Sequence, residues 1–326
     1  MIDVSASVER FKLREVFTIS RGSRTEAEVV TVVARLGEHQ GWGECVPYKR
    51  YGETPESVLA QVAEMAAAVG GEADPITALQ AHPAGAARNA LDCALWDLRA
   101  KTEGRPVWDL LGQPKPKTIT TAFTLSLEDP DVMREKATRE AARPLLKIKL
   151  GGEGDLERLE AVRAGAPNAA IVVDANEGWT VESYAEIAPT LLRLGVQMVE
   201  QPLPAGEDDA LAGIERPLPV CADESCHTSA SLPDLNGKYD MVNIKLDKTG
   251  GLTEALKLRD AARAEGFKIM MGCMVGTSLA MAPAVLVAQD AEVVDLDGPL
   301  LLGEDRTSPI QFEGSEMSAA TGELWG

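Results

Sequence analysis

The sequence predicts an α/β protein: a (β/α)7β barrel of the TIM type, preceded by an α+β capping domain. The first observation is a series of short apolar runs, each ending in a charged residue, that recurs at intervals of roughly 25 residues. The second is that residues 1–113 lack this rhythm and show other strand and helix patterns. The third is length, because 326 residues suffice for one barrel and one smaller domain.

The capping domain, residues 1–113, is expected to begin with an antiparallel meander. Its three strands are Val4–Phe11, Val29–Leu36 and Trp42–Glu44. The polar, glycine-containing stretch 18–25 between the first two strands is expected to be a mobile loop. An amphipathic helix over Ala87–Lys101 is expected to cover the meander.

The barrel domain is expected to span residues 114–299 and to contain eight parallel strands. Each candidate is a short run of β-forming residues, and helical patterns separate the runs. The strands are Thr118–Thr124, Leu145–Leu150, Ile171–Asp174, Met198–Glu200, Val220–Asp223, Met241–Lys245, Lys268–Gly272 and Val293–Asp297. The tail, residues 300–326, is expected to return to the capping domain.

Composition excludes several classes of protein. The net charge of −19 argues against nucleic acid or an anionic membrane surface as a partner. The apolar residues, 45% of the chain, never form a run long enough to span a membrane. The N-terminus lacks the features of an export signal, and the five scattered cysteines suit reduced thiols, so we expect a cytoplasmic protein.

Lys147 and Lys149 lie two positions apart in the apolar run Leu145–Gly151. Side chains alternate between the two faces of a strand, so these two lysines point to the same face. Lysines are rarely buried unless they are paired. Carboxylates are therefore expected opposite this pair.

Carboxylates end three of the following strands. Asp174, Glu200 and Asp223 each close an apolar run, and a barrel gathers the C-terminal ends of its strands at the active-site face. Oxygen ligands without thiolate or imidazole suit Mg²⁺, which retains positions for water or substrate. We expect one Mg²⁺ per subunit at these three residues, although any one of them alone is better explained as a solvated acid.

Lys245 ends the sixth strand and Lys149 the second, so the two lie on opposite walls of the barrel. Two bases on opposite faces of one carbon suit a 1,1-proton transfer, in which one removes a proton and the other returns it. Burial and neighbouring positive charge would lower the pKa of such a lysine, as a general base requires. Lys147 and the metal would stabilise the charge that develops on an enolate.

The order Lys-x-Lys, Asp, Glu, Asp and Lys on consecutive strands resembles the muconate-lactonising subgroup of the enolase superfamily. Sites of that superfamily use a Lys or His base with Mg²⁺. Further motifs that carry the resemblance are Gly41-Trp42-Gly43-Glu44, Ala90–Leu98, Leu110-Leu111-Gly112 and Val199-Glu200-Gln201-Pro202. The resemblance extends over nearly the whole chain and implies the same barrel and capping domain.

Asp295 and Asp297 lie on one face of the eighth expected strand, in phase with the other charged strand ends. Two more carboxylates beside an anionic cluster repel each other unless a cation binds them. Here the resemblance narrows to dipeptide epimerases, whose Asp-x-Asp motif receives the α-ammonium group of the substrate. It also implies that Thr124, on the first strand, approaches the substrate.

Arg21 and Arg24 lie in a segment that resembles the capping loop of Ala-Glu epimerases, where an arginine would meet the glutamate side chain. For each arginine, a solvated position on the loop is an equal alternative. Tyr48 and Tyr51 either help to close the site or pack within the capping domain, and Met274 lines either the core or the pocket.

The resemblance therefore implies a Mg²⁺-dependent isomerase, a dipeptide epimerase that acts through an enolate on the C-terminal residue of an L-Ala-L/D-Glu-like dipeptide. The alternative on the same site is a lyase, either an o-succinylbenzoate synthase or an acid-sugar dehydratase. A catalytically inactive barrel that serves as a binding module is a second alternative. A cycloisomerase is disfavoured because its substrate lacks an α-ammonium group. The expected partner is a small dipeptide, and assembly into a homo-oligomer is compatible with the sequence.

Overall fold

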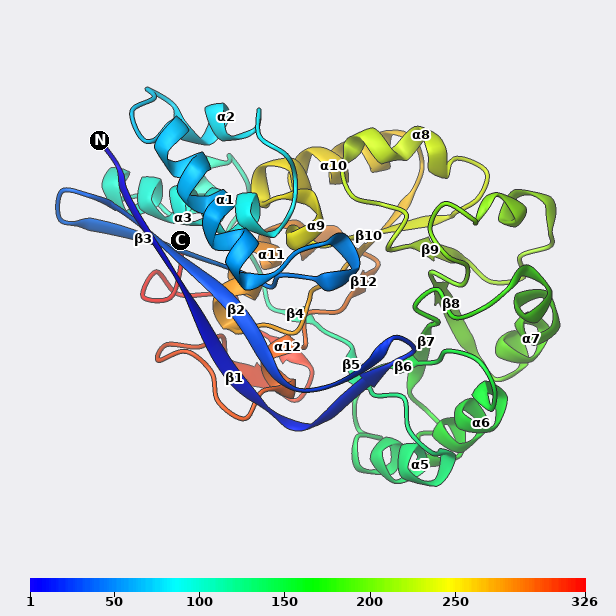
Figure 1. Ribbon diagram of the computed structural model, residues 1–326. Helices are drawn as coiled ribbons and strands as arrows, with labels where there is room; N and C mark the ends of the chain where they lie inside the picture. Colours follow the sequence, from blue (N-terminus) through cyan, green and yellow to red (C-terminus); the bar gives the residue numbers. More distant parts are fainter.

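A computed structural model describes all residues, 1–326 (Figure 1). The chain opens with a three-stranded antiparallel sheet in the order β1-β2-β3. Its strands are β1 (Asp3–Ile19), β2 (Gly22–Leu36) and β3 (His39–Cys45). The first two strands are long and extend beyond the sheet as a two-stranded ribbon that reaches across to the green part of the chain (Figure 1).

The stretch 18–25 is a β-hairpin, so the expectation of a mobile loop was wrong. The pairing of β1 with β2 runs from Asp3 opposite Arg35 to Ile19 opposite Gly22, which leaves only Ser20 and Arg21 in the turn. The polar sequence did not indicate this hairpin because the end of the ribbon lies outside the core. Pairing between the two strands satisfies its backbone groups whatever the polarity of the side chains.

Helices cover the sheet and connect it to the barrel. They are η1 (Lys49–Tyr51), α1 (Pro55–Val69), α2 (Pro75–Leu79), α3 (Ala86–Glu103) and α4 (Val107–Leu110). Helix α1 has Thr54 as its N-cap and Pro55 in the first turn, both favourable at those positions. Helix α3 is almost entirely buried because it lies between the sheet and the barrel (Figure 1).

Glycine allows α3 to approach β3 closely. A Cβ atom at Gly43 would lie 2.0 Å from the carbonyl oxygen of Ala90, and one at Gly41 would lie 2.1 Å from that of Ala94. No side chain fits at either distance. The two glycines of the motif around Trp42 therefore set the distance between helix and sheet.

Eight parallel strands form the predicted barrel, in the order β12-β11-β10-β9-β8-β7-β6-β5. They are β5 (Phe123–Leu125), β6 (Leu145–Lys149), β7 (Ala170–Asp174), β8 (Val196–Glu200), β9 (Val220–Ala222), β10 (Met241–Ile244), β11 (Lys268–Met271) and β12 (Val293–Val294). The connecting elements are α5 (Pro130–Arg139), α6 (Asp155–Gly165), α7 (Val181–Arg193), η2 (Asp209–Gly213), η3 (Ser229–Ser231), α8 (Leu232–Leu235), α9 (Leu246–Thr249), α10 (Leu252–Ala264), α11 (Ser278–Val287) and η4 (Ala288–Asp290), and α12 (Gly298–Leu301) follows β12.

The first and last strands meet at a seam held by single hydrogen bonds. The amide of Ala122 donates to the carbonyl oxygen of Val294 at 2.8 Å, and the amide of Leu296 donates to Oγ1 of Thr121 at 2.8 Å. The run Thr118–Thr124, expected as one strand, is divided here. Its first part, β4 (Ile119–Thr120), leaves the barrel and pairs with the tail.

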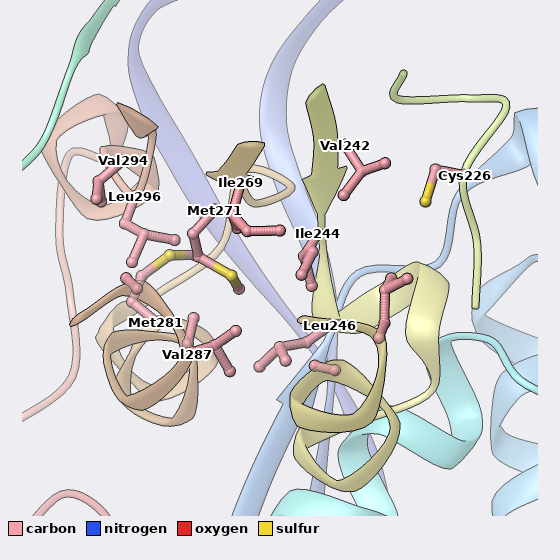
Figure 2. Close-up of a cluster of buried hydrophobic side chains, with 14 of the residues drawn as sticks. Cys226, Val242, Ile244, Leu246, Ile269, Met271, Met281, Val287, Val294 and Leu296 are labelled. Carbon is pink, nitrogen blue, oxygen red and sulfur yellow. The ribbon is translucent and has the colours of Figure 1, made fainter. Parts of the chain in front are cut away.

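The core lies mainly between the strands and the helices around them. Figure 2 shows part of this layer, where Ile244 and Met271 on the outer face of the barrel meet Met281 and Val287 on α11. The strands alternate, so residues two positions before the charged strand ends point inward. Five inward-pointing residues form a separate apolar cluster inside the barrel: Val172, Met198, Cys221, Met241 and Met270.

The tail packs against the rest of the chain at several points. Strands β13 (Phe312–Glu313) and β14 (Glu316–Met317) form a small sheet with β4. Nε1 of Trp325 donates to the carbonyl oxygen of Cys93 at 3.0 Å, and the amide of Gly326 donates to Asp97 at 2.7 Å. Among all the helices, none has the length and apolar character needed to cross a membrane.

Candidate active site

Charged side chains gather at the C-terminal ends of the barrel strands. Lys149 on β6 pairs in register with Asp174 on β7, and Asp174 pairs with Glu200 on β8. The parallel register places these ends at one level, directly above the apolar cluster inside the barrel. The charged layer therefore has an apolar floor, which strengthens the interactions between its charges.

Lys147 lies at the centre of the acids. Its Nζ atom is 2.6 Å from Glu200, 2.7 Å from Asp295 and 3.2 Å from Asp174. Burial would lower the pKa of Lys147, but the three carboxylates outweigh burial and raise it well above its ordinary value. This side chain is therefore a permanent cation, suited to electrostatic work rather than to proton transfer.

Lys149 and Lys245 face the same cavity from opposite walls, as their strands predict. Lys149 Nζ lies 2.5 Å from Asp174, and Lys245 Nζ lies 2.6 Å from Asp223. Strands β6 and β10 are four places apart in the eight-stranded sheet, and both lysines line the cavity at its mouth. The geometry therefore brings together two amines that a single small molecule could meet on its two faces.

A lowered lysine pKa was expected from the sequence, but the neighbouring carboxylates have the opposite effect on Lys245. Burial lowers the pKa of Lys245, but Asp223 and Glu200 outweigh it and raise the pKa well above its ordinary value. The carboxylates respond in turn. Burial opposes the ionisation of Asp223, yet Lys245 and Lys248 hold its pKa well below the usual range.

Asp174, Glu200 and Asp223 are all buried and come from three neighbouring strands. As they stand, no three Asp, Glu, His or Cys side chains are arranged to hold one metal ion, because the acids face ammonium groups. The charge balance nevertheless favours a cation. Burial and Asp174 raise the pKa of Glu200 to about 7, so the lysines do not offset all the negative charge. The residues fit Mg²⁺ in ligand type and charge, provided that the carboxylates turn away from the lysines.

Asp295 and Asp297 follow β12 and point into the same cavity. Asp297 accepts a hydrogen bond of 2.6 Å from the amide of Thr124, and Oγ1 of Thr124 lies 3.4 Å from Asp295. Burial and Asp295 raise the pKa of Asp297 to about 7. Two adjacent acids, of which one resists ionisation, form a site that a cationic group would stabilise.

Arg21 and Arg24 differ in what they contact. Arg21, in the hairpin turn, donates to Glu224 at 2.7 Å, to the hydroxyl of Tyr48 at 2.8 Å and to the carbonyl oxygen of Asn176 at 2.8 Å. It therefore links the ribbon to the ends of β7 and β9. Its donors face protein groups, so Arg21 is a structural link at the mouth of the site.

Arg24 has no carboxylate partner. It lines the cavity, and its guanidinium lies 5.8 Å from the ring centre of Phe17. Burial lowers the pKa of Arg24, which is the response of a cation removed from water without a counter-charge. This arginine is therefore available to an anionic group in the cavity.

The two tyrosines and Met274 lie at the edge of the cavity. The rings of Tyr48 and Tyr51 pack edge to face at 5.3 Å, and Tyr51 packs against His227 at 4.7 Å. Both tyrosines line the cavity, so they serve packing and closure together. Met274 is buried and also lines the cavity, within a small cluster that includes Val275.

Lys248 is a buried cation that sequence reasoning missed. Its Nζ atom donates to Asp223 Oδ1 at 2.7 Å, to the carbonyl oxygen of Asp223 at 2.5 Å and to that of Asn243 at 2.9 Å. Asn243 in turn donates to Glu200 at 2.7 Å. The signal was the position of Lys248, three residues after Lys245 and in the short helix α9 that begins directly after it.

Unusual backbone geometry marks two of the strand ends. The non-glycine residues with positive φ are Asn176, Glu177 and Gln201, which follow β7 and β8. Gln201 is buried, and its Oε1 accepts a hydrogen bond of 2.8 Å from the amide of Asp223. Strained conformations of this kind persist only where the surroundings impose them, and here they fix the acids above the barrel.

A parallel barrel with a capping domain and a layer of acids and lysines at its mouth defines an enzyme built for acid–base chemistry. Two family models cover this architecture. "Mandelate racemase / muconate lactonizing enzyme, N-terminal domain" matches residues 1–112, and "Enolase C-terminal domain-like" matches residues 132–322. The chain belongs to the enolase superfamily, in its mandelate racemase and muconate-lactonizing enzyme group.

Individual relatives are similar over nearly their whole length. The L-Ala-D/L-Glu epimerase of Escherichia coli (strain K12) is 46% identical over 97% of this chain and 99% of its own. The N-acetyl-D-glutamate racemase of Pseudoalteromonas sp is 45% identical over 91% and 95%. A crystal structure of an enolase family member from Agrobacterium tumefaciens, with homology to dipeptide epimerases and with bound sodium and L-Ala-L-Glu, matches with a TM-score of 0.97. It is 52% identical and covers 100% of both chains.

Proposed function

We propose that this protein is a Mg²⁺-dependent dipeptide epimerase that inverts the α-carbon of the C-terminal residue of L-Ala-L/D-Glu-like dipeptides. The observation that carries the proposal is the shared cavity of Lys149, Lys245 and the pair Asp295 and Asp297. Two amines on opposite walls suit proton transfer on both faces of one carbon. The paired acids suit a substrate that also carries a positive charge.

In this proposal, one of the two lysines removes the α-proton and the other delivers a proton to the opposite face. Lys147, held as a cation by three carboxylates, stabilises the negative charge that develops on the substrate carboxylate. Asp295 and Asp297 hold the α-ammonium group, and Thr124 keeps Asp297 in place through its backbone amide.

Asp174, Glu200 and Asp223 would hold the Mg²⁺ ion. Bound there, the ion would supply positive charge beside the substrate carboxylate and would compensate the acids that now pair with Lys149 and Lys245. Lys248 and Asn243 orient two of these acids from behind.

Arg24 would contact the γ-carboxylate of a C-terminal glutamate. Its guanidinium lines the cavity without a counter-charge, whereas Arg21 is engaged by Glu224 and Tyr48. The similarity to the L-Ala-D/L-Glu epimerase of Escherichia coli supports the same choice of substrate.

Solvent exchange tests the proposal directly. L-Ala-L-Glu is incubated with the enzyme and Mg²⁺ in D₂O, and the α-proton of the glutamate residue is followed by NMR. We expect the proton to disappear while the L,D-diastereomer accumulates. If no member of a library of L,L-dipeptides exchanges its α-proton, the proposal is wrong.

The substitution Asp297→Asn separates the epimerase from a lyase on the same site. Without the second carboxylate, we expect kcat/KM for L-Ala-L-Glu to fall by about 100-fold, because a charged hydrogen bond to the ammonium group is lost. The substrates of o-succinylbenzoate synthases and acid-sugar dehydratases lack this group. An unchanged kcat/KM for the dipeptide would contradict the assigned role of Asp297.

A second candidate is racemisation of an N-acylated glutamate, which the similarity to an N-acetyl-D-glutamate racemase favours. Such a substrate could also meet Arg24, but its amide would leave Asp297 without a cationic partner. Running N-acetyl-D-glutamate beside L-Ala-L-Glu in the same D₂O assay separates the two. Faster exchange of the N-acetylated substrate would replace the dipeptide assignment.

We also propose that the protein works in the cytoplasm. Its five cysteines are free, and four of them are buried, which suits a reducing compartment. A homo-oligomer remains a prediction, which light scattering would test.

A further inference from the structure

A second cavity lies beside the active-site cavity, outside the seam of the barrel. It holds about 260 Å³, compared with about 50 Å³ for the space among the charged residues. Residues of β1, β5, α5 and α12 surround it. Its apolar lining includes Leu13, Phe17, Phe123, Leu125, Leu300 and Leu301.

Three residues line both cavities and so form the wall between them: Phe17, Thr124 and Leu301. Thr124 contacts Asp295 and Asp297, and Leu301 ends the short helix α12 that begins directly after Asp297. The wall therefore stands at the end of the active site where the paired acids lie.

The outer cavity offers an apolar group a lining of leucine and phenylalanine side chains. Of the charged residues at its rim, Lys136 lies 2.5 Å from Glu15, Arg143 lies 2.7 Å from Glu140, and Nε of Arg14 donates to the carbonyl oxygen of Leu302 at 2.7 Å. An anionic ligand would have to compete with the glutamates for Lys136 and Arg143. An aliphatic side chain would instead contact the leucine and phenylalanine lining.

The members of the wall are not equally replaceable. Thr124 supports the paired acids, and Phe17 lies against the guanidinium of Arg24. Leu301 is half-buried, has an aliphatic side chain, and packs against the small apolar cluster that contains Met274 and Leu302. Leu301 is therefore the position where the wall can be opened without removing a charged contact.

We propose that the wall of Phe17, Thr124 and Leu301 restricts the N-terminal residue of the substrate to a small side chain, and that the cavity behind it is a latent subsite for an aliphatic one. This inference rests on the proposed function, because it requires the α-ammonium group at Asp295 and Asp297. The N-terminal side chain then starts beside the wall and reaches the outer cavity only when the wall is opened.

The test compares Leu301→Ala with Leu300→Ala in the D₂O exchange assay. Leu300 lines the outer cavity but not the active-site cavity, so it is a matched control. The substrates are L-Ala-L-Glu and L-Leu-L-Glu, and the readout is the ratio of their kcat/KM values. We expect the wild-type enzyme to prefer L-Ala-L-Glu at least tenfold. Leu301→Ala should shift the ratio toward L-Leu-L-Glu at least tenfold, and Leu300→Ala should shift it less than twofold.

Two results would overturn the inference while the proposed function stands. One is a wild-type enzyme that exchanges both dipeptides equally well; the other is an unshifted ratio in a folded Leu301→Ala variant. If thermal unfolding shows that this variant is not folded, Leu301→Val supplies the same comparison with a smaller expected shift, of about threefold. Failure of the wild-type enzyme to exchange any dipeptide instead removes the proposed function, and this inference with it.

Discussion

At the scale of single residues, the proposed chemistry depends on Lys149 and Lys245, and each is held by one carboxylate. Lys149 contacts Asp174 and Lys245 contacts Asp223, so the two amines are fixed on opposite walls. Lys147 differs because three acids lie within 3.2 Å of its Nζ atom. The number of neighbouring carboxylates therefore separates the two roles that we propose for these lysines.

Removing either base should separate exchange from epimerisation. In Lys149→Ala and in Lys245→Ala, we expect epimerisation to fall by at least about 1,000-fold, because the proton can no longer be returned to the opposite face. Each variant should still exchange the α-proton of one diastereomer with D₂O, and the two variants should differ in which one. NMR of L-Ala-L-Glu and L-Ala-D-Glu measures both rates. Exchange of the same diastereomer by both variants would show instead that the two lysines act on the same face of the α-carbon.

Arg24 should determine the preference for an acidic C-terminal residue. Its guanidinium has no protein carboxylate, so Arg24→Leu removes a partner of the substrate and leaves no buried acid unpaired. We expect kcat/KM for L-Ala-L-Glu to fall by about 10- to 100-fold. The value for L-Ala-L-Gln should change far less, and steady-state kinetics with both dipeptides provides the comparison. Equal losses for the two would show that Arg24 acts on packing alone.

At the scale of elements, β3 and α3 explain how the capping domain is attached to the barrel. The two glycines around Trp42 let the helix lie directly on the strand. From the other side of α3, Asp92 accepts hydrogen bonds from the amide and the hydroxyl of Thr253 on α10, at 3.0 and 2.7 Å. One helix thus joins both domains, which places the ribbon of β1 and β2 over the barrel mouth (Figure 1).

Gly43→Ala should therefore destabilise the whole protein. The new Cβ would lie 2.0 Å from the backbone oxygen of Ala90, which no side-chain rotation can relieve. We expect a loss of at least about 3 kcal/mol in the free energy of unfolding, seen as a lower unfolding temperature. Gly71→Ala is the control, since a Cβ there meets nothing within 4 Å. Similar unfolding temperatures for the two variants would contradict the close packing of β3 and α3.

At the scale of the whole molecule, the contact between capping domain and barrel contains a buried acid. Asp247 on α9 accepts hydrogen bonds from the amide of Val46 at 3.0 Å and from Asn89 at 2.9 Å. Burial raises its pKa to about 7. In the folded protein this group keeps its proton up to that pH, whereas in the unfolded chain it loses the proton near pH 4.

Stability should therefore decline as the pH rises from about 4 to about 7, because over this range the folded state binds a proton that the unfolded state has released. Asp247→Asn cannot ionise, and its amide oxygen can accept the same two hydrogen bonds. We expect this variant to be more stable than the wild type at pH 8, by about 2–4 kcal/mol, and nearly equal to it at pH 4. Thermal unfolding at both pH values measures the difference. A variant that is less stable at pH 8 would contradict the assigned ionisation.

Much of the site followed from sequence because the period of a strand and the order of a barrel are local rules. Asp174, Glu200 and Asp223 end successive strands, so their meeting at one face required no knowledge of distant contacts. Lys248 was not predicted from the sequence, because its proximity to Lys245 depends on the short helix that the chain forms there. The hairpin over residues 18–25 was not predicted either, because pairing between β1 and β2 makes its residues extended in spite of their polar side chains.

The sequence by itself determined the barrel, the layer of acids and lysines at its mouth, and the family to which that layer is similar. Only the tertiary structure decided that Arg24 has no counter-charge while Arg21 is bound, and that a second cavity stands behind Leu301. The physical reason is the range of the interactions involved. Strand period and strand order act within a few residues or one repeat. A counter-charge or a wall depends instead on segments that lie hundreds of residues apart in the chain and meet only after folding.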